Sequence, residues 1–264
     1  MIMIGTSGWQ YRHWRNRFYP PGVPTGRWLE FYAERFATVE LNASFYRLPE
    51  RATFVDWRER TPADFTFAPK LSRYLTHLRR LRDPAEPVAR FLDRVDGLGD
   101  RLGPVLLQLP PNLTVDPGAL DAVLAQFPPE VRVAVEPRHD SWWTASVRAV
   151  LERYGAALCW ADRHGRPVTP TWRTADFGYL RLHEGLARPR PRYGPAALTS
   201  WVRRIDAAFP ADEPVYTYFN NDPHGAALVN AAMFAAQCHR HGRATTRVHS
   251  QADQPIPLPA ASTG

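Results

Sequence analysis

Lysine is almost absent from this sequence of 264 residues: of its 33 basic residues, Lys70 is the single lysine and the others are arginine. Because arginine replaces lysine almost everywhere, we attribute the formal net charge of +7 to a compositional bias rather than to an acidic partner. A buried lysine ammonium can lose its proton near neutral pH, whereas an arginine guanidinium cannot. Lys70 is therefore a candidate functional residue.

Cysteines and long apolar segments are also scarce. Cys159 and Cys238 stand in apolar surroundings, which favours buried, reduced thiols and excludes a disulfide framework. The sequence contains no run of about 18 apolar residues, so it predicts no membrane-spanning segment. The first residues lack the basic and apolar regions of a signal peptide. We therefore expect a cytoplasmic protein.

Hydrophobic residues make up 44% of the chain and charged residues 22%, which is typical of a globular domain. Short apolar runs alternate with helical patterns, and each run suits a parallel strand that is covered on both faces. The runs are residues 2–5, 38–41, 65–68, 103–109, 131–135, 156–161, 179–182 and 215–219. Helices are expected at residues 26–36, 50–60, 85–98, 117–127, 146–154, 195–209 and 226–241.

This alternation predicts the α/β class and a single (β/α)8 TIM barrel over residues 1–242, with a doubly wound sheet as the alternative. Residues 163–177, after the sixth strand, are rich in proline, threonine and arginine. They predict a long loop that replaces or shortens the helix at this point. Residues 243–264 are polar and then proline-spaced, and we expect them to form a disordered tail.

Polar side chains follow nearly every predicted strand, and in a TIM barrel the active site lies at the C-terminal ends of the strands. Burying several charges near one another costs several kcal/mol per ion unless they are paired, so a converging set predicts a functional site. The candidate catalytic residues are Glu40, Lys70 and Glu136. The candidate substrate-binding residues are Ser7, Trp9, Asn42, Tyr46, Gln108, Arg138, Trp142, Arg181, His183, Asn220, Asn221 and Asp222.

Several of these residues belong to motifs that occur in order along the chain: GTSGW at residues 5–9, ELNASFY at 40–46, LQLPP at 107–111, EPR at 136–138, YLRLH at 179–183 and YFNND at 218–222. With these motifs the chain resembles the YecE-like family, a TIM-barrel group described as a domain of unknown function. The resemblance covers residues 1–242. It implies a barrel distantly akin to sugar isomerases and endonuclease-IV-type enzymes, and it supplies no reaction.

The chain departs from the family pattern after the seventh strand. Where the family tends to have His-Gly, this sequence has His183-Glu184-Gly185. The extra residue leaves the conformation of the following loop, residues 186–193, open.

The leading functional hypothesis is an enzyme, an isomerase, lyase or hydrolase, that performs acid–base chemistry on a small anionic or polyhydroxylated substrate, sugar-like or phosphorylated. Glu40 and Glu136 can take opposite roles as base and acid if their environments separate their pKa values. Lys70 is an electrophilic stabiliser, a proton donor or, if desolvated, a Schiff-base nucleophile. A salt bridge from Lys70 to either carboxylate is the structural alternative. Arg138 and Arg181 suit a clamp for a carboxylate or phosphate.

Two further classes stay open as weaker alternatives. Glu40, Glu136, His183 and Asp222 are a conceivable ligand set for a divalent metal in an isomerase or phosphodiesterase, but positive charge at the same rim opposes it. We predict no cofactor. Nucleic-acid or phosphate-ligand binding is suggested by the basic runs at residues 79–82 and 188–192, although the arginine bias explains them equally well. The oligomeric state is left open.

Overall fold

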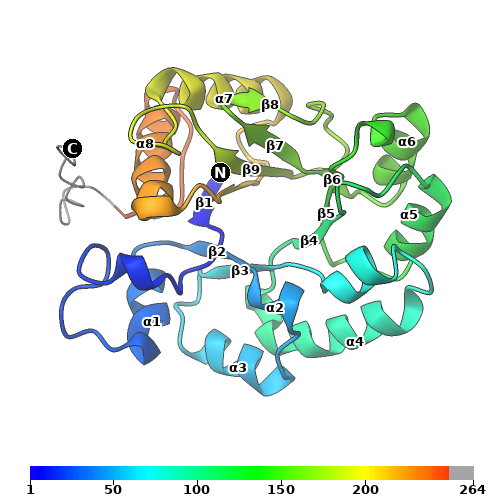
Figure 1. Cartoon of the computed structure of the whole chain (residues 1–264), viewed down its shortest axis with the longest axis horizontal. Helices are drawn as coiled ribbons and strands as arrows, with labels where there is room; N and C mark the ends of the chain where they lie inside the picture. The colour runs from blue at the N-terminus through cyan, green and yellow to red at the C-terminus, as the bar shows by residue number, and fades with distance from the viewer. Residues whose placement is uncertain (250–264) are drawn as a thin grey trace, which may run out of the picture.

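The computed structural model describes residues 1–249. Strands occupy the middle of the molecule and helices lie around them (Figure 1). The strands are β1 (Ile2–Thr6), β2 (Thr38–Leu41), β3 (Thr66–Pro69), β4 (Val105–Gln108), β5 (Val133–Glu136), β6 (Ala157–Leu158), β7 (Trp160–Arg163), β8 (Arg166–Pro167), β9 (Gly178–Glu184) and β10 (Val215–Phe219). The α-helices are α1 (Trp28–Ala33), α2 (Ala43–Tyr46), α3 (Arg51–Glu59), α4 (Ala85–Val95), α5 (Pro117–Leu124), α6 (Ala145–Arg153), α7 (Pro195–Ala208) and α8 (Ala226–Arg240).

Local sequence signals account for most of these elements. Every predicted apolar run overlaps a strand, and every predicted helical pattern overlaps a helix. The start of α5 is set by Asp116, whose side chain accepts a hydrogen bond from Ala119 N at 2.9 Å. The sequence analysis missed α2 and β8, which are only 4 and 2 residues long. No helix lies between β7 and β9 in this part of the described chain, so the predicted long loop is confirmed.

The strands form a large parallel sheet and a small one, rather than the complete (β/α)8 barrel that we expected. The seven-stranded sheet has the order β3-β2-β1-β10-β9-β7-β8, and the three-stranded sheet has the order β4-β5-β6. Among the described residues, β3 meets the β4 segment in isolated bridges, Phe67–Leu102 and Lys70–Leu106. Pro69 and Pro104 lie at this junction and lack the N–H that a continuous ladder would need. The fold is therefore a mixed α/β fold whose sheet is not closed.

A second interruption lies within the sixth predicted run. Ala157 and Leu158 pair with β5, whereas the chain from Trp160 onward pairs with β9. The change of partner takes place at Cys159, whose N–H donates to Val135 O at 2.8 Å. The predicted single strand is therefore two short strands that belong to different sheets.

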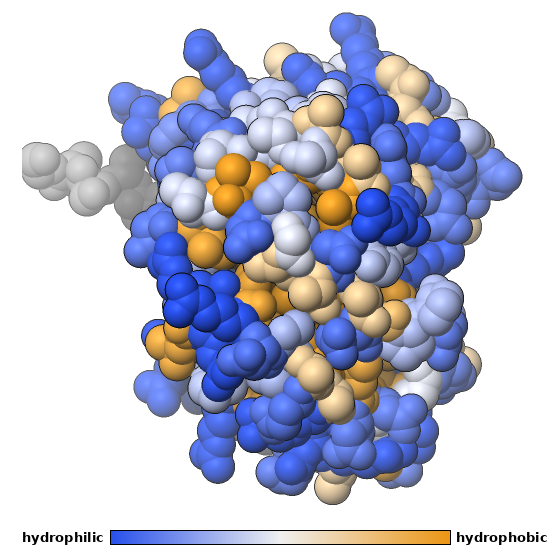
Figure 2. Space-filling model, turned by 90° about the vertical axis from the view of Figure 1, so that its right-hand side faces the viewer, coloured by the Kyte–Doolittle hydropathy of each residue, from blue (hydrophilic) through white to orange (hydrophobic). Residues whose placement is uncertain are grey.

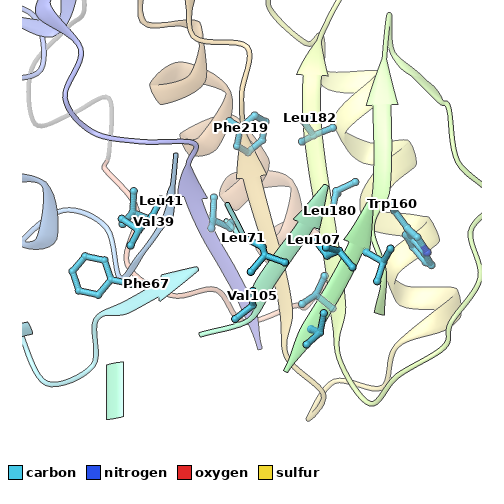
Figure 3. Packing of buried hydrophobic residues seen from close by; sticks show 14 of the residues in the cluster. Val39, Leu41, Phe67, Leu71, Val105, Leu107, Trp160, Leu180, Leu182 and Phe219 are labelled. Atoms are coloured by element: carbon cyan, nitrogen blue, oxygen red, sulfur yellow. The ribbon is translucent and has the colours of Figure 1, made fainter. Parts of the chain in front are cut away.

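Alternating side chains place apolar residues on both faces of the strands. On β4, Val105 and Leu107 join the large cluster beneath the helices, and Leu106 joins a smaller cluster between the strands. Figure 3 shows part of the large cluster along the strands. Cys159 and Cys238 are buried and free, as expected. Both faces of the sheet are thus occupied, and the strand ends are left for polar side chains.

Residues 243–249, which the sequence analysis assigned to the tail, pack on the fold. Ile2 N donates to Ala244 O at 2.9 Å, and Thr246 N donates to Ile2 O at 3.0 Å. The Arg243 guanidinium donates to Phe209 O at 2.9 Å. This segment therefore pairs with the start of β1 through a parallel bridge between Thr245 and Ile2. The remainder of the predicted tail, residues 250–264, lies outside the described residues.

The surface carries many charged side chains. On the face seen in Figure 2, hydrophilic side chains predominate around the edge, and apolar ones show between them. None of the helices in residues 1–249 has the length and apolar character needed to cross a membrane.

Candidate functional site

Arg181 joins the two predicted catalytic carboxylates at the ends of β2, β5 and β9. Its Nε donates to Glu40 Oε2 at 2.8 Å and its Nη2 donates to Glu40 Oε1 at 2.7 Å. Its Nη1 donates to Glu136 Oε2 at 2.7 Å. All three residues are buried, with at most 1% of each exposed. The direct contacts between these opposite charges offset the cost of removing each charge from water, so the bidentate pair can be stable in the interior.

Neutral side chains occupy most of the remaining lone pairs of the two carboxylates. Glu40 accepts from Ser7 Oγ and, at 2.9 Å, from the Tyr179 hydroxyl. Glu136 accepts from Gln108 Nε2 at 2.5 Å. Burial by itself would raise the pKa of each carboxyl, but the charge of Arg181 outweighs it, together with hydrogen bonds from Arg181 and Ser7 to Glu40 and from His183 to Glu136. The pKa of Glu40 is lowered, and that of Glu136 lies well below its ordinary value, so both groups are ionised.

His183 is held between Glu136 and Asn220. Its Nε2 lies 2.8 Å from Glu136 Oε1, and its Nδ1 lies 3.0 Å from the side-chain nitrogen of Asn220. Since the Asn220 amide donates to Nδ1, the proton of the ring is placed on Nε2, which donates to the carboxylate. Burial, followed by the charge of Arg181, lowers the pKa of His183. The imidazole is therefore neutral and fixed in one tautomer.

Lys70 follows β3 and is only 6% exposed. Its Nζ lies 3.8 Å from the centroid of the Phe45 ring. Within residues 1–249 it forms no ion pair and donates no side-chain hydrogen bond, so the alternative of a salt bridge to Glu40 or Glu136 does not hold. Burial, followed by the positive charge of Arg181, lowers the pKa of Lys70 to about 8. Lys70 therefore titrates close to neutral pH.

A cavity of about 240 Å³ opens beside Glu136 at the ends of β5, β7 and β9. Arg138 lines it with a side chain that is 33% exposed, and its Nη2 lies 3.4 Å from Glu136 Oε1. Trp143 and Arg163 also line this cavity, and the sequence analysis missed both. The tandem Trp142-Trp143 was a usable signal, but the sequence does not show which indole faces the cavity. A larger depression of about 1100 Å³ around Arg132 and Tyr216 contains neither carboxylate.

Four predicted substrate-binding residues serve the fold instead. Trp142 is fully buried and donates from Nε1 to Leu113 O at 2.7 Å. Trp9 packs edge-on against Trp57, with ring centroids 5.4 Å apart. The buried Asn221 donates to Asn230 Oδ1 at 2.9 Å. Arg181 uses its donors on Glu40 and Glu136, so the expected anion clamp of Arg181 with Arg138 is corrected.

The other predicted residues lie at the edge of the site. Asn42 donates to Ser7 O at 3.0 Å, which places it beside Glu40. Tyr46 is 71% exposed at the end of α2. Asp222 accepts from Trp14 Nε1 at 2.8 Å and lies 2.7 Å from His13 Nε2, away from the two buried glutamates. Of the conceivable metal ligands, Glu136 and His183 are in contact, Glu40 is bound to Arg181, and Asp222 is bound to Trp14 and His13. Residues 1–249 contain no group of three or more His, Cys, Asp or Glu side chains that suits a metal ion.

The loop after His183 is compact despite the additional residue Glu184. Gly185 N donates to Pro191 O at 2.9 Å, and Glu184 N donates to the Tyr193 hydroxyl at 2.8 Å. A Cβ atom on Gly185 would lie 2.0 Å from Arg192 O, so only glycine permits this close approach. Glu184 extends β9 by one residue, and Gly185 then turns the chain.

Comparison with known proteins agrees with the motifs. The family model described as "Protein of unknown function DUF72" matches residues 3–255. This chain belongs to the DUF72 family. UPF0759 protein YunF from Bacillus subtilis (strain 168) is 24% identical over 274 residues, which cover 87% of this chain and 92% of YunF. The resemblance that the motifs indicated is thus confirmed at the level of this family.

Solved structures of DUF72 proteins share the fold. The DUF72 family protein TM1631 from Thermotoga maritima MSB8 has a TM-score of 0.77 and 25% identity, covering 90% of this chain and 99% of TM1631. EF0366 from Enterococcus faecalis V583 has a TM-score of 0.74 and 18% identity, covering 90% of this chain and 96% of the other. These likenesses support the mixed α/β fold with a large parallel sheet. The family description names no substrate, so the chemistry of the DUF72 site is argued from its geometry.

We expect this DUF72 protein to lose stability in acid because Glu136 is ionised in the folded state. Its pKa in the folded protein lies well below the ordinary value of 4.5 that the unfolded chain approaches. The stabilisation is complete above that ordinary value and is lost as the pH falls through the folded pKa. Urea unfolding at a series of pH values measures it. The Glu136→Gln variant should be less stable at pH 7 but less sensitive to acid, and equal acid sensitivity of the two proteins would contradict the assignment.

Proposed function

We propose that this protein is an enzyme that moves protons on a small anionic or polyhydroxylated molecule, and that Lys70 is its acid–base group. One observation carries the proposal: a buried ammonium stands at the strand ends and has no carboxylate partner among residues 1–249. Such a group costs stability, and perturbed ionisable groups of this kind cluster at functional sites. An isomerase, a lyase and a hydrolase all fit this chemistry.

The proposal divides the roles differently from the first hypothesis. Glu40 and Glu136 are both ionised and both bound to Arg181, so neither holds a proton to donate at neutral pH. Their contribution is to hold the positive charge of Arg181 beneath the site. Lys70, with a pKa of about 8, is close to the pH at which general acid–base catalysis is most effective.

The cavity beside Glu136 supports a ligand that combines an anionic group with hydroxyls. The half-exposed Arg138 suits a carboxylate or phosphate. His183 and Glu136 supply polar groups at one wall of the cavity, and the Trp143 indole suits the apolar face of a sugar ring. This combination favours sugar acids and sugar phosphates as the substrate class.

The proposal is tested with a panel of sugar acids and sugar phosphates in D2O. Proton NMR is expected to show loss of a C–H signal from at least one compound in the presence of the protein. Trp143→Ala should weaken binding of that compound by about 10-fold, since it removes one wall of the cavity. Arg138→Gln should raise the KM for the anionic compound.

The matched control is Arg153→Gln on α6, where the arginine pairs with Asp121 at the surface. This variant should bind and exchange like the wild type. If no compound of the panel exchanges, or if the Trp143 and Arg138 variants behave like the Arg153 variant, the proposal fails.

A further inference from the structure

The Lys70 side chain is held on a rigid support. Lys70 N donates to Leu41 O at 3.2 Å, and Ser44 Oγ donates to Lys70 O at 2.8 Å. Leu71 N donates to Leu106 O at 2.9 Å on the other side. These bonds attach the backbone of the residue to β2, to α2 and to β4, and the side chain extends from there to place Nζ over the Phe45 ring. Precise support of this kind is what a covalent catalytic group requires.

The amine of Lys70 is both desolvated and reachable. Nζ has no hydrogen-bond acceptor within residues 1–249, yet it is not among the buried polar atoms that lack a partner. The small exposed part of Lys70 therefore includes Nζ. A desolvated lysine without an ion-pair partner becomes a nucleophile because its neutral form is accessible.

Charged and titratable groups face Lys70 from four other elements. Arg181 on β9 and Arg138 after β5 lower its pKa, and Glu40 on β2 and Glu136 on β5 raise it. His77 lies beyond Phe45, with ring centroids 5.0 Å apart. Burial, followed by the charge of Lys70, lowers the pKa of His77 to about 4, so this imidazole is neutral. The surroundings thus contain two cations and two anions, and within residues 1–249 neither anion forms an ion pair with Nζ.

We propose that Lys70 forms an imine with an aldehyde or ketone that carries an anionic group. The inference rests on the proposed function. Lys70 does not line the cavity beside Glu136, whereas Arg138 lines it and also acts electrostatically on Lys70, so the carbonyl compound would have to extend from Arg138 to Nζ. The lone pair of Nζ forms a bond to the carbonyl carbon, and the C=O bond breaks. The two hydrogens of the neutral amine leave with the carbonyl oxygen as water, and a proton from solvent converts the imine to the iminium ion. The iminium ion then acidifies the neighbouring C–H bond.

The experiment uses the full-length protein, glyoxylate as the anionic aldehyde and sodium cyanoborohydride, which reduces the iminium ion to a stable secondary amine. Peptide mapping by mass spectrometry locates the adduct. Because Lys70 is the single lysine, the amine of Met1 is the other aliphatic primary amine of the chain and serves as an internal reference. Met1 N lies outside the site, where it donates to Ala211 O at 2.6 Å.

Burial, followed by the charge of Arg243, lowers the pKa of the Met1 amine from 8.0, so loss of the proton by itself would not favour Lys70 over Met1. We expect the adduct on Lys70 to form at least about 10-fold faster than that on Met1 at pH 8 because the site binds and orients glyoxylate. Its rate should rise with pH as the amine loses its proton, with a midpoint near the Lys70 pKa of about 8. Propanal, a neutral aldehyde, should react with Lys70 more slowly than glyoxylate. Modification of Lys70 no faster than that of Met1 would overturn the inference.

Two variants sharpen the result. Lys70→Arg keeps the charge but has no primary amine, so the adduct at residue 70 should disappear while the Met1 adduct remains. Arg138→Gln removes a cation near Nζ, so the midpoint of the pH profile should move to higher pH and the preference for glyoxylate should fall. An unchanged profile would overturn the anionic part of the inference. Deuterium exchange without an adduct would overturn imine formation but support the acid–base function of Lys70. An adduct without deuterium exchange would support imine formation but overturn the acid–base function.

Discussion

Replacement of Arg181 by methionine is expected to lower the free energy of unfolding by about 3–5 kcal/mol. Arg181 makes three charge-assisted hydrogen bonds to two buried carboxylates, those of Glu40 and Glu136. The substitution removes all three bonds and leaves both carboxylates without their cation. Domains of ordinary stability unfold with about 5–15 kcal/mol, so the loss is a large share of the total. Few single substitutions in this protein should cost as much.

The loss should depend on pH in the sense opposite to that of the wild type. Without Arg181, burial raises the pKa values of Glu40 and Glu136 in the folded state, so the folded protein binds more protons than the unfolded chain. The variant should therefore regain stability as the pH falls from neutral toward the carboxyl range, whereas the wild type should weaken in acid. Urea unfolding of both proteins at matched pH values tests whether their free energies of unfolding change with pH in opposite directions.

Two controls frame this measurement. Arg153→Met breaks a surface ion pair whose side chains are 62% and 35% exposed, and it should cost no more than about 1 kcal/mol. Arg181→Lys retains the charge but cannot make the bidentate contact, so it should fall between the wild type and Arg181→Met and remain measurable if the methionine variant does not fold. Equal losses in Arg181→Met and Arg153→Met would show that the buried charges are not compensated by Arg181.

Replacement of Lys70 by methionine should act in the opposite direction on stability while abolishing proton transfer. The pKa of Lys70 falls from the ordinary value of 10.5 to about 8 on folding. The protonated amine therefore opposes folding, and this cost is fully present below pH 8 and disappears as the pH rises through 10.5. At about 1.4 kcal/mol per pH unit, Lys70→Met should gain about 3–3.5 kcal/mol at neutral pH.

The same variant should lose at least about 100-fold in the rate of deuterium exchange, which is the usual contribution of a positioned acid–base group. Unfolding experiments at neutral pH and at about pH 9.5 should show the gap between Lys70→Met and the wild type closing as the pH rises. Lys70→Arg is the matched variant: its charge persists at every pH, so it should show no such closing. A Lys70→Met protein that is less stable than the wild type but still active would refute the role of Lys70.

Much of the local structure was predictable because it depends on nearby residues. Residues 38–41 and 215–219 were predicted as strands with the bounds that β2 and β10 have, since each is a short apolar run between breakers. The placement of Glu40, Lys70 and Glu136 at strand ends followed from the same alternation. The choice between Trp142 and Trp143 did not, because adjacent residues in a loop have no period that tells the buried side from the exposed one.

By itself, the sequence determined which segments form strands and helices, and it singled out Lys70 through its rarity. The tertiary structure alone decided the charge pairing, because Arg181 meets Glu40 and Glu136 across 141 and 45 residues of chain. It also decided that the sheet formed by residues 1–249 is not closed, since the chain changes its pairing partner from β5 to β9 at Cys159 and a local pattern does not show which strand a residue pairs with. Short-range patterns set the elements, whereas the partner of a buried charge depends on how distant elements pack. Within residues 1–249, that packing left the ammonium of Lys70 against the Phe45 ring and without an ion-pair partner.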